Sequence, residues 1–218
     1  MRAPEATPFV PKAKPTHSRR PALVLASASP RRRALLATLG LTFAVVAPDV
    51  DESPRDGESA EALATRLALA KAAAIRRADA VVLAADTVVT QRGHIFGKPR
   101  DAAEAVQMLT RLRGTRHEVI TGVCARPVGG PPLLAAARTF VWMRPYSEEE
   151  LRAYVATGAP FDKAGGYGIQ DAPFRPVARI EGCYTNVVGL PLCVTRAVLH
   201  RAGVELRRAR PACEHAGT

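Results

Sequence analysis

LVLASASPRRR, residues 23–33, decides the fold of the first part of the chain. Its apolar beginning, residues 23–26, predicts a buried strand. A proline and the apolar spacing after it predict a helix over 30–39, with Ser29 as the N-cap. The stretch therefore predicts a strand that turns sharply into a helix, as in folds that pack helices on a sheet.

Positive charge gathers where this helix is expected to begin. The first turn of a helix offers unpaired backbone N–H groups and the positive end of the helix dipole. Ser29, Arg31 and Arg32 would add a hydroxyl and guanidinium groups there. The junction therefore predicts a binding site for a polyanion such as a triphosphate, with a solvated arginine patch on a capped helix as the alternative.

Strands and helices alternate along the rest of the chain, with one hairpin among them. We expect strands over 22–26, 42–47, 80–85, 117–126, 133–143, 177–181 and 185–188. We expect helices over 30–39, 59–77, 101–112, 147–158 and 190–202. The mixture predicts an α/β (mixed α+β) fold with one extended mixed sheet and flanking helices. The glycine- and proline-rich residues 160–176 are expected to form a functional loop.

The net charge of the chain is unevenly distributed. The formal charge of the 218 residues is +11, of which residues 1–20 carry +4 and residues 207–218 carry +2. We expect 1–21 to be a disordered basic extension, 22–206 to be one catalytic domain and 207–218 to be a flexible tail. The moderately basic remainder suits an enzyme for anionic substrates as well as a nucleic-acid partner.

The cysteines and the lack of a long apolar stretch bear on location. The four cysteines form no C-x-x-C pair and have no histidine cluster beside them. We therefore expect reduced thiols in the cytoplasm and no structural zinc site. No apolar stretch approaches the roughly 20 residues that a membrane span needs, so no membrane partner is expected.

Two acidic residues are candidates for the chemistry. Asp86 follows the apolar run 81–85, and we expect it to end a buried strand, where α/β folds expose functional groups. Glu52 lies in an acidic loop after the second expected strand. Metal–phosphate sites take one or two carboxylates, with the phosphates completing the coordination. Asp86 and Glu52 are therefore predicted to hold a divalent cation, unless Asp86 only caps a turn at the strand end.

Lysines and an amide complete the candidate set. Lys71 lies on the long expected helix, and Lys98 lies between Gly97 and a proline that fix its backbone. Each is either a phosphate ligand or a mobile surface lysine. Gln170 ends a glycine-rich loop that lacks the ending of a Walker loop, and its amide can both donate to and accept from a base. His117 begins a strand and is expected to be packed or exposed there, not catalytic.

Together these motifs resemble the Maf family of nucleoside triphosphate pyrophosphatases. Besides the helix with Lys71, the matching stretches are Ser27–Arg32, Asp51–Ser53, Ala84–Val89, Gly97–Asp101, His117–Val123, Asp162–Gln170 and Asn186–Leu192. They follow the family order and cover roughly residues 22–203. The set is far more specific than any single motif.

The resemblance implies a fold of two lobes around a cleft, similar to that of inosine triphosphate pyrophosphatases. It implies a cytoplasmic homodimer that hydrolyses a nucleoside triphosphate to the monophosphate and pyrophosphate with Mg²⁺ or Mn²⁺. In the family, Asp86 matches the proposed proton acceptor, and Arg31, Thr87 and Gln170 match positions tied to substrate choice. The Asp86-Thr87 pair and the loop ending at Gln170 resemble the branch that acts on dTTP and UTP.

The expected mechanism joins these residues in one cleft. The helix start and the two lysines bind the triphosphate from opposite walls, because their positive charges offset the negative charges of the phosphates. Asp86, directly or through the metal, activates water for attack at the α-phosphorus. Thr87 and Gln170 read the pyrimidine base, and no specific nucleic acid is expected as a partner.

Two residues depart from the family pattern, and two alternatives stay open. Gly166 stands where alanine is more usual, and Asp171 stands where glycine is common. Asp171 is expected to stiffen the turn and to add negative charge near the base pocket. One alternative is an enzyme for 7-methyl-GTP or for a broad range of modified nucleotides. The other is a nucleic-acid-binding or septum-inhibiting protein, which predicts salt-sensitive binding to DNA or RNA.

Overall fold

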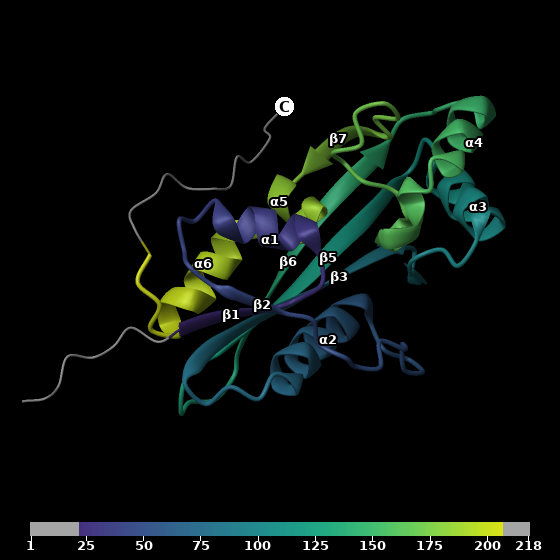
Figure 1. The fold of residues 1–218 in the computed structure, drawn as a ribbon. Helices are drawn as coiled ribbons and strands as arrows, with labels where there is room; N and C mark the ends of the chain where they lie inside the picture. The colour runs from purple at the N-terminus through teal and green to yellow at the C-terminus, as the bar shows by residue number, and fades with distance from the viewer. Residues whose placement is uncertain (1–21, 207–218) are drawn as a thin grey trace, which may run out of the picture.

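A seven-stranded mixed sheet forms the centre of the structure (Figure 1). The computed structural model describes residues 22–206, so the expected extension 1–21 and tail 207–218 lie outside the described residues. The strands are β1 (Ala22–Ala26), β2 (Ala44–Val46), β3 (Ala80–Gln91), β4 (His94–Phe96), β5 (Arg116–Arg126), β6 (Leu133–Met143) and β7 (Val177–Glu181). The helices are α1 (Pro30–Ala37), α2 (Ala60–Ala74), α3 (Ala102–Leu112), α4 (Glu148–Ala156), α5 (Tyr184–Val188) and α6 (Leu192–Arg201), with the 3₁₀ turns η1 (Ala159–Asp162) and η2 (Ala164–Gly166).

Both parallel and antiparallel pairing occur in this sheet. Its strand order is β2-β1-β3-β5-β6-β7, and β4 pairs with the end of β3. β1 runs parallel to β2 and β3, whereas β3, β5, β6 and β7 pair antiparallel in succession. The expected mixed α/β class, with one extended sheet and flanking helices, is confirmed.

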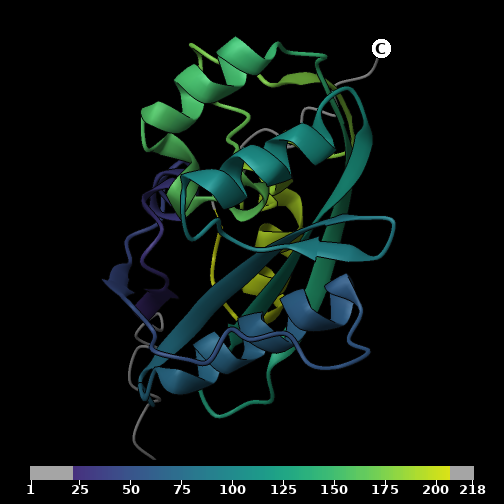
Figure 2. The ribbon, with the colours of Figure 1, turned by 90° about the vertical axis from the view of Figure 1, so that its right-hand side faces the viewer.

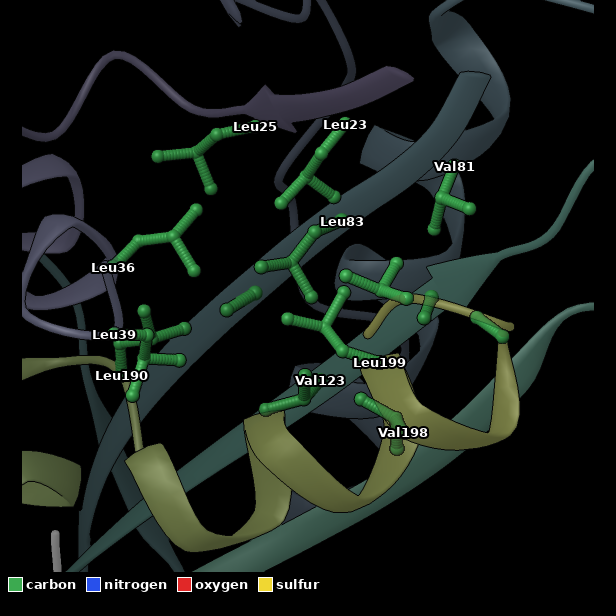
Figure 3. Packing of buried hydrophobic residues seen from close by; sticks show 14 of the residues in the cluster. Leu23, Leu25, Leu36, Leu39, Val81, Leu83, Val123, Leu190, Val198 and Leu199 are labelled. Carbon is green, nitrogen blue, oxygen red and sulfur yellow. The ribbon is translucent and has the colours of Figure 1, made fainter. Parts of the chain in front are cut away.

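The helices cover both faces of the sheet and one of its ends. α2 lies along one face, α1 and α6 lie on the other, and α3 and α4 lie beside the far end of the long strands (Figures 1 and 2). Side chains alternate between the two faces of a strand. Val82 of β3 accordingly packs with Ala68 of α2, while Leu83 packs with Leu36 of α1 and Leu199 of α6 (Figure 3).

A separate hydrophobic cluster lies at the end that carries α3 and α4. It includes Leu109 of α3, Leu151 and Tyr154 of α4, and Val119 of β5. Burial of each such side chain stabilises the fold by about 1.5–3 kcal/mol. Because this cluster is separate from the one around Leu83, each end of the long strands has a core of its own. This agrees with the two lobes that the resemblance implies.

Capping signals in the sequence located the helix starts correctly. The side chains of Ser29, Ser59, Asp101 and Ser147 each accept a hydrogen bond from a backbone N–H of the first turn of α1, α2, α3 and α4, respectively. Ser147 and the glutamate three residues later form a complete capping box. Such caps act within a few residues and are therefore visible in the sequence.

The expected end of the third strand at Asp86 is wrong. β3 continues through Asp86 to Gln91, and Asp86 pairs with Gly122 of β5. However, the parallel neighbour β1 ends at Ala26, opposite Ala84. Asp86 therefore lies just beyond the carboxyl end of the parallel part of the sheet, which is where α/β folds expose functional groups.

The expected strand over 185–188 is also wrong, because these residues form helix α5. Their β-branched side chains favour a strand, but the tertiary setting decides otherwise. The buried Asn186 amide donates to Val119 O of β5 and Thr139 Oγ1 of β6. Gly189, with φ of 121°, then ends the helix in a conformation that favours glycine.

Candidate active site

A cavity of about 840 Å³ is lined by the β1–α1 junction, by α2 and β3, and by the loops around Lys98 and Gln170. All nine predicted site residues line it: Ser29, Arg31, Arg32, Glu52, Lys71, Asp86, Thr87, Lys98 and Gln170. They come from segments that span more than half the chain, so only the fold brings them together. The expected mechanism requires this convergence in one cleft, and the cavity lining agrees with it.

The edge of β3 is uncovered where it meets the cavity. β1 covers this edge as far as Ala84, and β4 covers it again from Val89. Among the described residues no strand pairs with the short stretch between them on this edge. Asp86 and Thr87 lie in that gap, with their side chains on opposite faces of the sheet.

Close packing of α2 brings a lysine to Asp86. A Cβ atom at Gly122, the cross-strand partner of Asp86, would lie 2.4 Å from Ala64 O of α2, so only glycine permits this approach. Lys71 follows Ala64 by two helical turns on the same buried face. Its Nζ atom therefore reaches Asp86 Oδ1 at 2.5 Å.

One buried ammonium group joins both predicted acidic residues. Lys71 Nζ also lies 2.7 Å from Glu52 Oε1, and the Lys71 side chain is only 8% exposed. Asp86 is equally buried, whereas Glu52 is about half exposed. The acidic loop is thus attached to the sheet through Lys71.

The pKa values of the two carboxyl groups are shifted in opposite directions. Burial raises the pKa of Asp86, against the opposing effect of Lys71 and Arg32. Burial also acts on Glu52, but there the hydrogen bond and charge of Lys71, with Lys98 and Arg32, hold the pKa below its ordinary value. Asp86 is the better proton acceptor of the two, and Glu52 stays ionised.

The start of α1 presents Arg32 to the sheet. Arg32 Nη2 donates to Thr87 Oγ1 at 3.0 Å, and Nε donates to Gly189 O at 2.9 Å. The hydroxyl of Thr87 also lies 3.0 Å from Thr121 Oγ1. These bonds fix the guanidinium beside Asp86 and Glu52, whose charges act against the lowering of the Arg32 pKa by burial.

Arg31 points the other way, across the mouth of the cavity. Its Nη1 atom donates to Asp162 Oδ2 at 2.6 Å, and Nη2 donates to Asp162 O at 3.1 Å. Lys163 Nζ binds Asp162 Oδ1 at 2.9 Å. The sequence motif that contains Asp162 and Lys163 does not reveal this role, because Arg31 is 131 residues away from Asp162 along the chain.

The remaining predicted residues lie exposed on loops around the cavity. Lys98 follows Gly97, whose carbonyl accepts a hydrogen bond from Gly165 N of η2. Gln170 is exposed at the tip of a turn. Both side chains are free to approach a ligand, in contrast to the fixed positions of Lys71 and Arg32.

His117 is packed inside the protein, which is one of the two placements expected for it. It is 1% exposed, and its Nε2 atom lies 2.7 Å from the hydroxyl of Tyr167. Burial lowers the pKa of His117 to about 4, so the ring is neutral near pH 7. It supports the loop behind the cavity.

The donor set suits a divalent cation that shares its coordination with a substrate. Within residues 22–206 no group of three or more His, Cys, Asp or Glu side chains could hold a metal alone. Asp86 and Glu52, drawn together by Lys71, offer carboxylate oxygens beside the helix start. Mg²⁺ is commonly bound by one or two carboxylates plus substrate phosphates, so these residues fit such an ion.

Comparisons with known proteins show the family of the chain. The model of the family described as "Maf-like protein" matches residues 22–202. A "dTTP/UTP pyrophosphatase" of Myxococcus xanthus (strain DK1622) is 52% identical over 186 residues, which cover 84% of this chain and 94% of the relative. Another, of Geobacter sulfurreducens (strain ATCC 51573 / DSM 12127 / PCA), is 50% identical and covers 83% and 96%.

Among solved structures, a HAM1 protein from Coxiella burnetii is similar with a TM-score of 0.41 and 18% identity, over 57% of this chain and 74% of that one. The family match spans both lobes of the described structure and every residue of the candidate site. The chain belongs to the Maf family.

Proposed function

We propose that this protein hydrolyses dTTP and UTP to the monophosphate and pyrophosphate. One observation carries the proposal: a single buried ammonium, Lys71 Nζ, holds both Asp86 and Glu52 in the cavity that the start of α1 also lines. The relatives at about 50% identity carry the same activity in their names. The substrate is accordingly a nucleoside triphosphate.

The triphosphate binds between the start of α1 and the two lysines. Arg32 is fixed by Thr87 and Gly189, so it meets a phosphate oxygen without losing further side-chain freedom. Arg31 reaches the phosphates by exchanging its bond with Asp162 for one with the substrate. Lys98 closes the site from the β4–α3 loop, where its exposed side chain can follow the ligand.

Asp86 acts as the proton acceptor. Its carboxylate takes a proton from a water molecule as the water oxygen bonds to the α-phosphorus, and the bond from that phosphorus to the bridging oxygen breaks. Pyrophosphate leaves with its charge stabilised by the arginines and lysines. The raised pKa of Asp86 makes it a stronger base than an exposed aspartate.

A divalent cation completes the proposed site. Asp86 and Glu52 would hold Mg²⁺ or Mn²⁺, which when bound neutralises phosphate charge. Gln170 and Thr87 are proposed to read the pyrimidine. The homodimer and the cytoplasmic location stay predictions. Within residues 22–206, no helix has the length and apolar character that crossing a membrane requires.

A panel of nucleoside triphosphates tests the proposal. Pyrophosphate release should be fastest with dTTP and UTP, and a chelator should abolish it. Fastest release from 7-methyl-GTP, or equal rates for all nucleotides, would contradict the assigned substrate. Binding of DNA or RNA that survives Asp86→Asn, without any hydrolysis by the wild-type protein, would favour the nucleic-acid alternative.

A further inference from the structure

The turn that carries Gln170 is held by a carboxylate at its own end. Asp171 Oδ2 accepts hydrogen bonds from Gly168 N at 3.0 Å and from the Tyr154 hydroxyl. In return, Asp171 N donates to Gly168 O at 3.2 Å. These bonds close a four-residue turn from both ends and leave Ile169 and Gln170 at its tip.

The hydroxyl that α4 contributes is itself fixed. The ring of Tyr154 stacks on Phe174 with a centroid distance of 4.3 Å, and Phe174 also contacts Tyr146 at 4.8 Å. Burial, and after it the hydrogen bond to Asp171, raises the pKa of Tyr154, so the hydroxyl keeps its proton and remains a donor. The core of the second lobe therefore sets the position of the turn.

Lys163 links this turn to α1. Its Nζ atom lies 3.9 Å from Asp171 Oδ2 and 2.9 Å from Asp162 Oδ1, and it also donates to Ala159 O. Asp162 in turn accepts from Arg31 at 2.6 Å. Ion pairs thus connect the phosphate end of the cavity with the turn at its other end.

Gly168 leaves the space that this arrangement occupies. A Cβ atom there would lie 2.8 Å from Asp171 Oδ2 and 2.9 Å from Lys163 Cε. Any side chain at this position would therefore push both groups away from the turn.

We propose that Asp171 is a positioning residue that fixes the turn presenting Gln170 and thereby sets the preference for uracil and thymine over cytosine. The inference rests on the proposed function, because it takes Gln170 to meet the base of a nucleoside triphosphate. Uracil offers an acceptor where cytosine carries an amino group, and an amide distinguishes them only when it is held in one orientation. Loosening the turn lets the amide serve either base.

The ratio of kcat/KM for UTP to that for CTP tests this inference. Asp171→Asn keeps the shape of the side chain but removes its charge, which weakens the bonds from Gly168 and Tyr154. We expect the ratio to fall about tenfold, as for loss of a charge-assisted hydrogen bond, and KM for UTP to rise more than kcat falls. Tyr154→Phe removes one hydroxyl and should shift the ratio in the same direction.

Asp79→Asn is the matched control. Asp79 is exposed, pairs with Arg77 and does not line the cavity, so its variant should keep the wild-type ratio. An unchanged ratio in both test variants, including the case in which kcat/KM falls equally for UTP and CTP, overturns the inference and leaves the proposed function standing. Should Asp171→Asn fail to fold, Tyr154→Phe decides by the same ratio. A wild-type protein that hydrolyses no nucleoside triphosphate refutes the proposed function and the inference together.

Discussion

The two walls of the cavity are built differently. The sheet wall, formed by Lys71, Asp86 and Thr87, places its charged groups on a long strand and a long helix, and Lys71 and Asp86 are almost fully buried. The loop wall, formed by residues 159–171, has only 3₁₀ turns, and its polar side chains, Asp162, Lys163, Gln170 and Asp171, are exposed or half-buried. Burial shifts the pKa values of charged groups, which suits the chemical step. A loop held by side-chain bonds suits recognition of a variable ligand.

The largest expected effect is on the sheet wall. Asp86→Asn removes the proposed proton acceptor and should lower kcat for UTP by about 10²–10⁴-fold, with a smaller change in KM. Steady-state pyrophosphate release measures both. Asp79→Asn, at an exposed aspartate outside the cavity, should retain wild-type kcat. Near-normal turnover by Asp86→Asn would remove this residue from the mechanism.

Lys71→Met tests how strongly the sheet wall depends on one cation. The change leaves Asp86 buried without its ammonium partner, so the free energy of unfolding should fall by about 3 kcal/mol, and the pKa of Asp86 should rise further. Urea unfolding measures the first effect, and a shift of the acid limb of kcat/KM to higher pH measures the second. Lys98→Met, at an exposed lysine, serves as the stability control. Equal stability of the two variants would argue against a buried charge cluster.

The loop wall predicts a pH effect through His117, which supports Tyr167. Its folded-state pKa of about 4 lies below the ordinary value of 6.5, so the unfolded chain binds the proton first. Stability is therefore fully present above pH 6.5 and is lost as the pH falls toward 4, by about 2 kcal/mol between pH 7 and 5. Unfolding of His117→Gln should lack this part of the pH dependence, while exposed His94→Gln should retain it. Parallel pH profiles for all three proteins would contradict the assignment.

The smallest effect concerns the support of Arg32. Thr87→Val removes the hydroxyl that Arg32 Nη2 contacts and leaves the strand intact, so KM for UTP should rise about fivefold with little loss of stability. Thr38→Val removes a hydroxyl at the exposed end of α1 and is the control. A wild-type KM in Thr87→Val would contradict both the support of Arg32 by Thr87 and the proposed contact of Thr87 with the base.

Features set by local signals could be predicted from the sequence, whereas features set by long-range pairing could not. The caps at Ser29 and Ser147 act within one helical turn, so the helix starts are visible in the sequence. Asp86 lies at an uncovered edge of β3 only because β1 ends at Ala26. Residues 185–188 form a helix where the Asn186 amide donates hydrogen bonds to β5 and β6. Such tertiary contacts override local propensity.

The site divides along the same line. Residue types and motif order were sufficient to name the residues that line the cavity, from Ser29 to Gln170. They could not show that Lys71 joins Asp86 to Glu52, or that Arg31 is held by Asp162. These contacts depend on side-chain directions that only the assembled fold sets.

Hydrolysis of UTP in ¹⁸O-labelled water tests the central claim most directly, because it reports which phosphorus the water attacks. Attack at the α-phosphorus, beside Asp86, places the label in the UMP phosphate and leaves pyrophosphate unlabelled. Label in pyrophosphate, or release of inorganic phosphate in its place, would contradict the arrangement of base and cations described for this cavity.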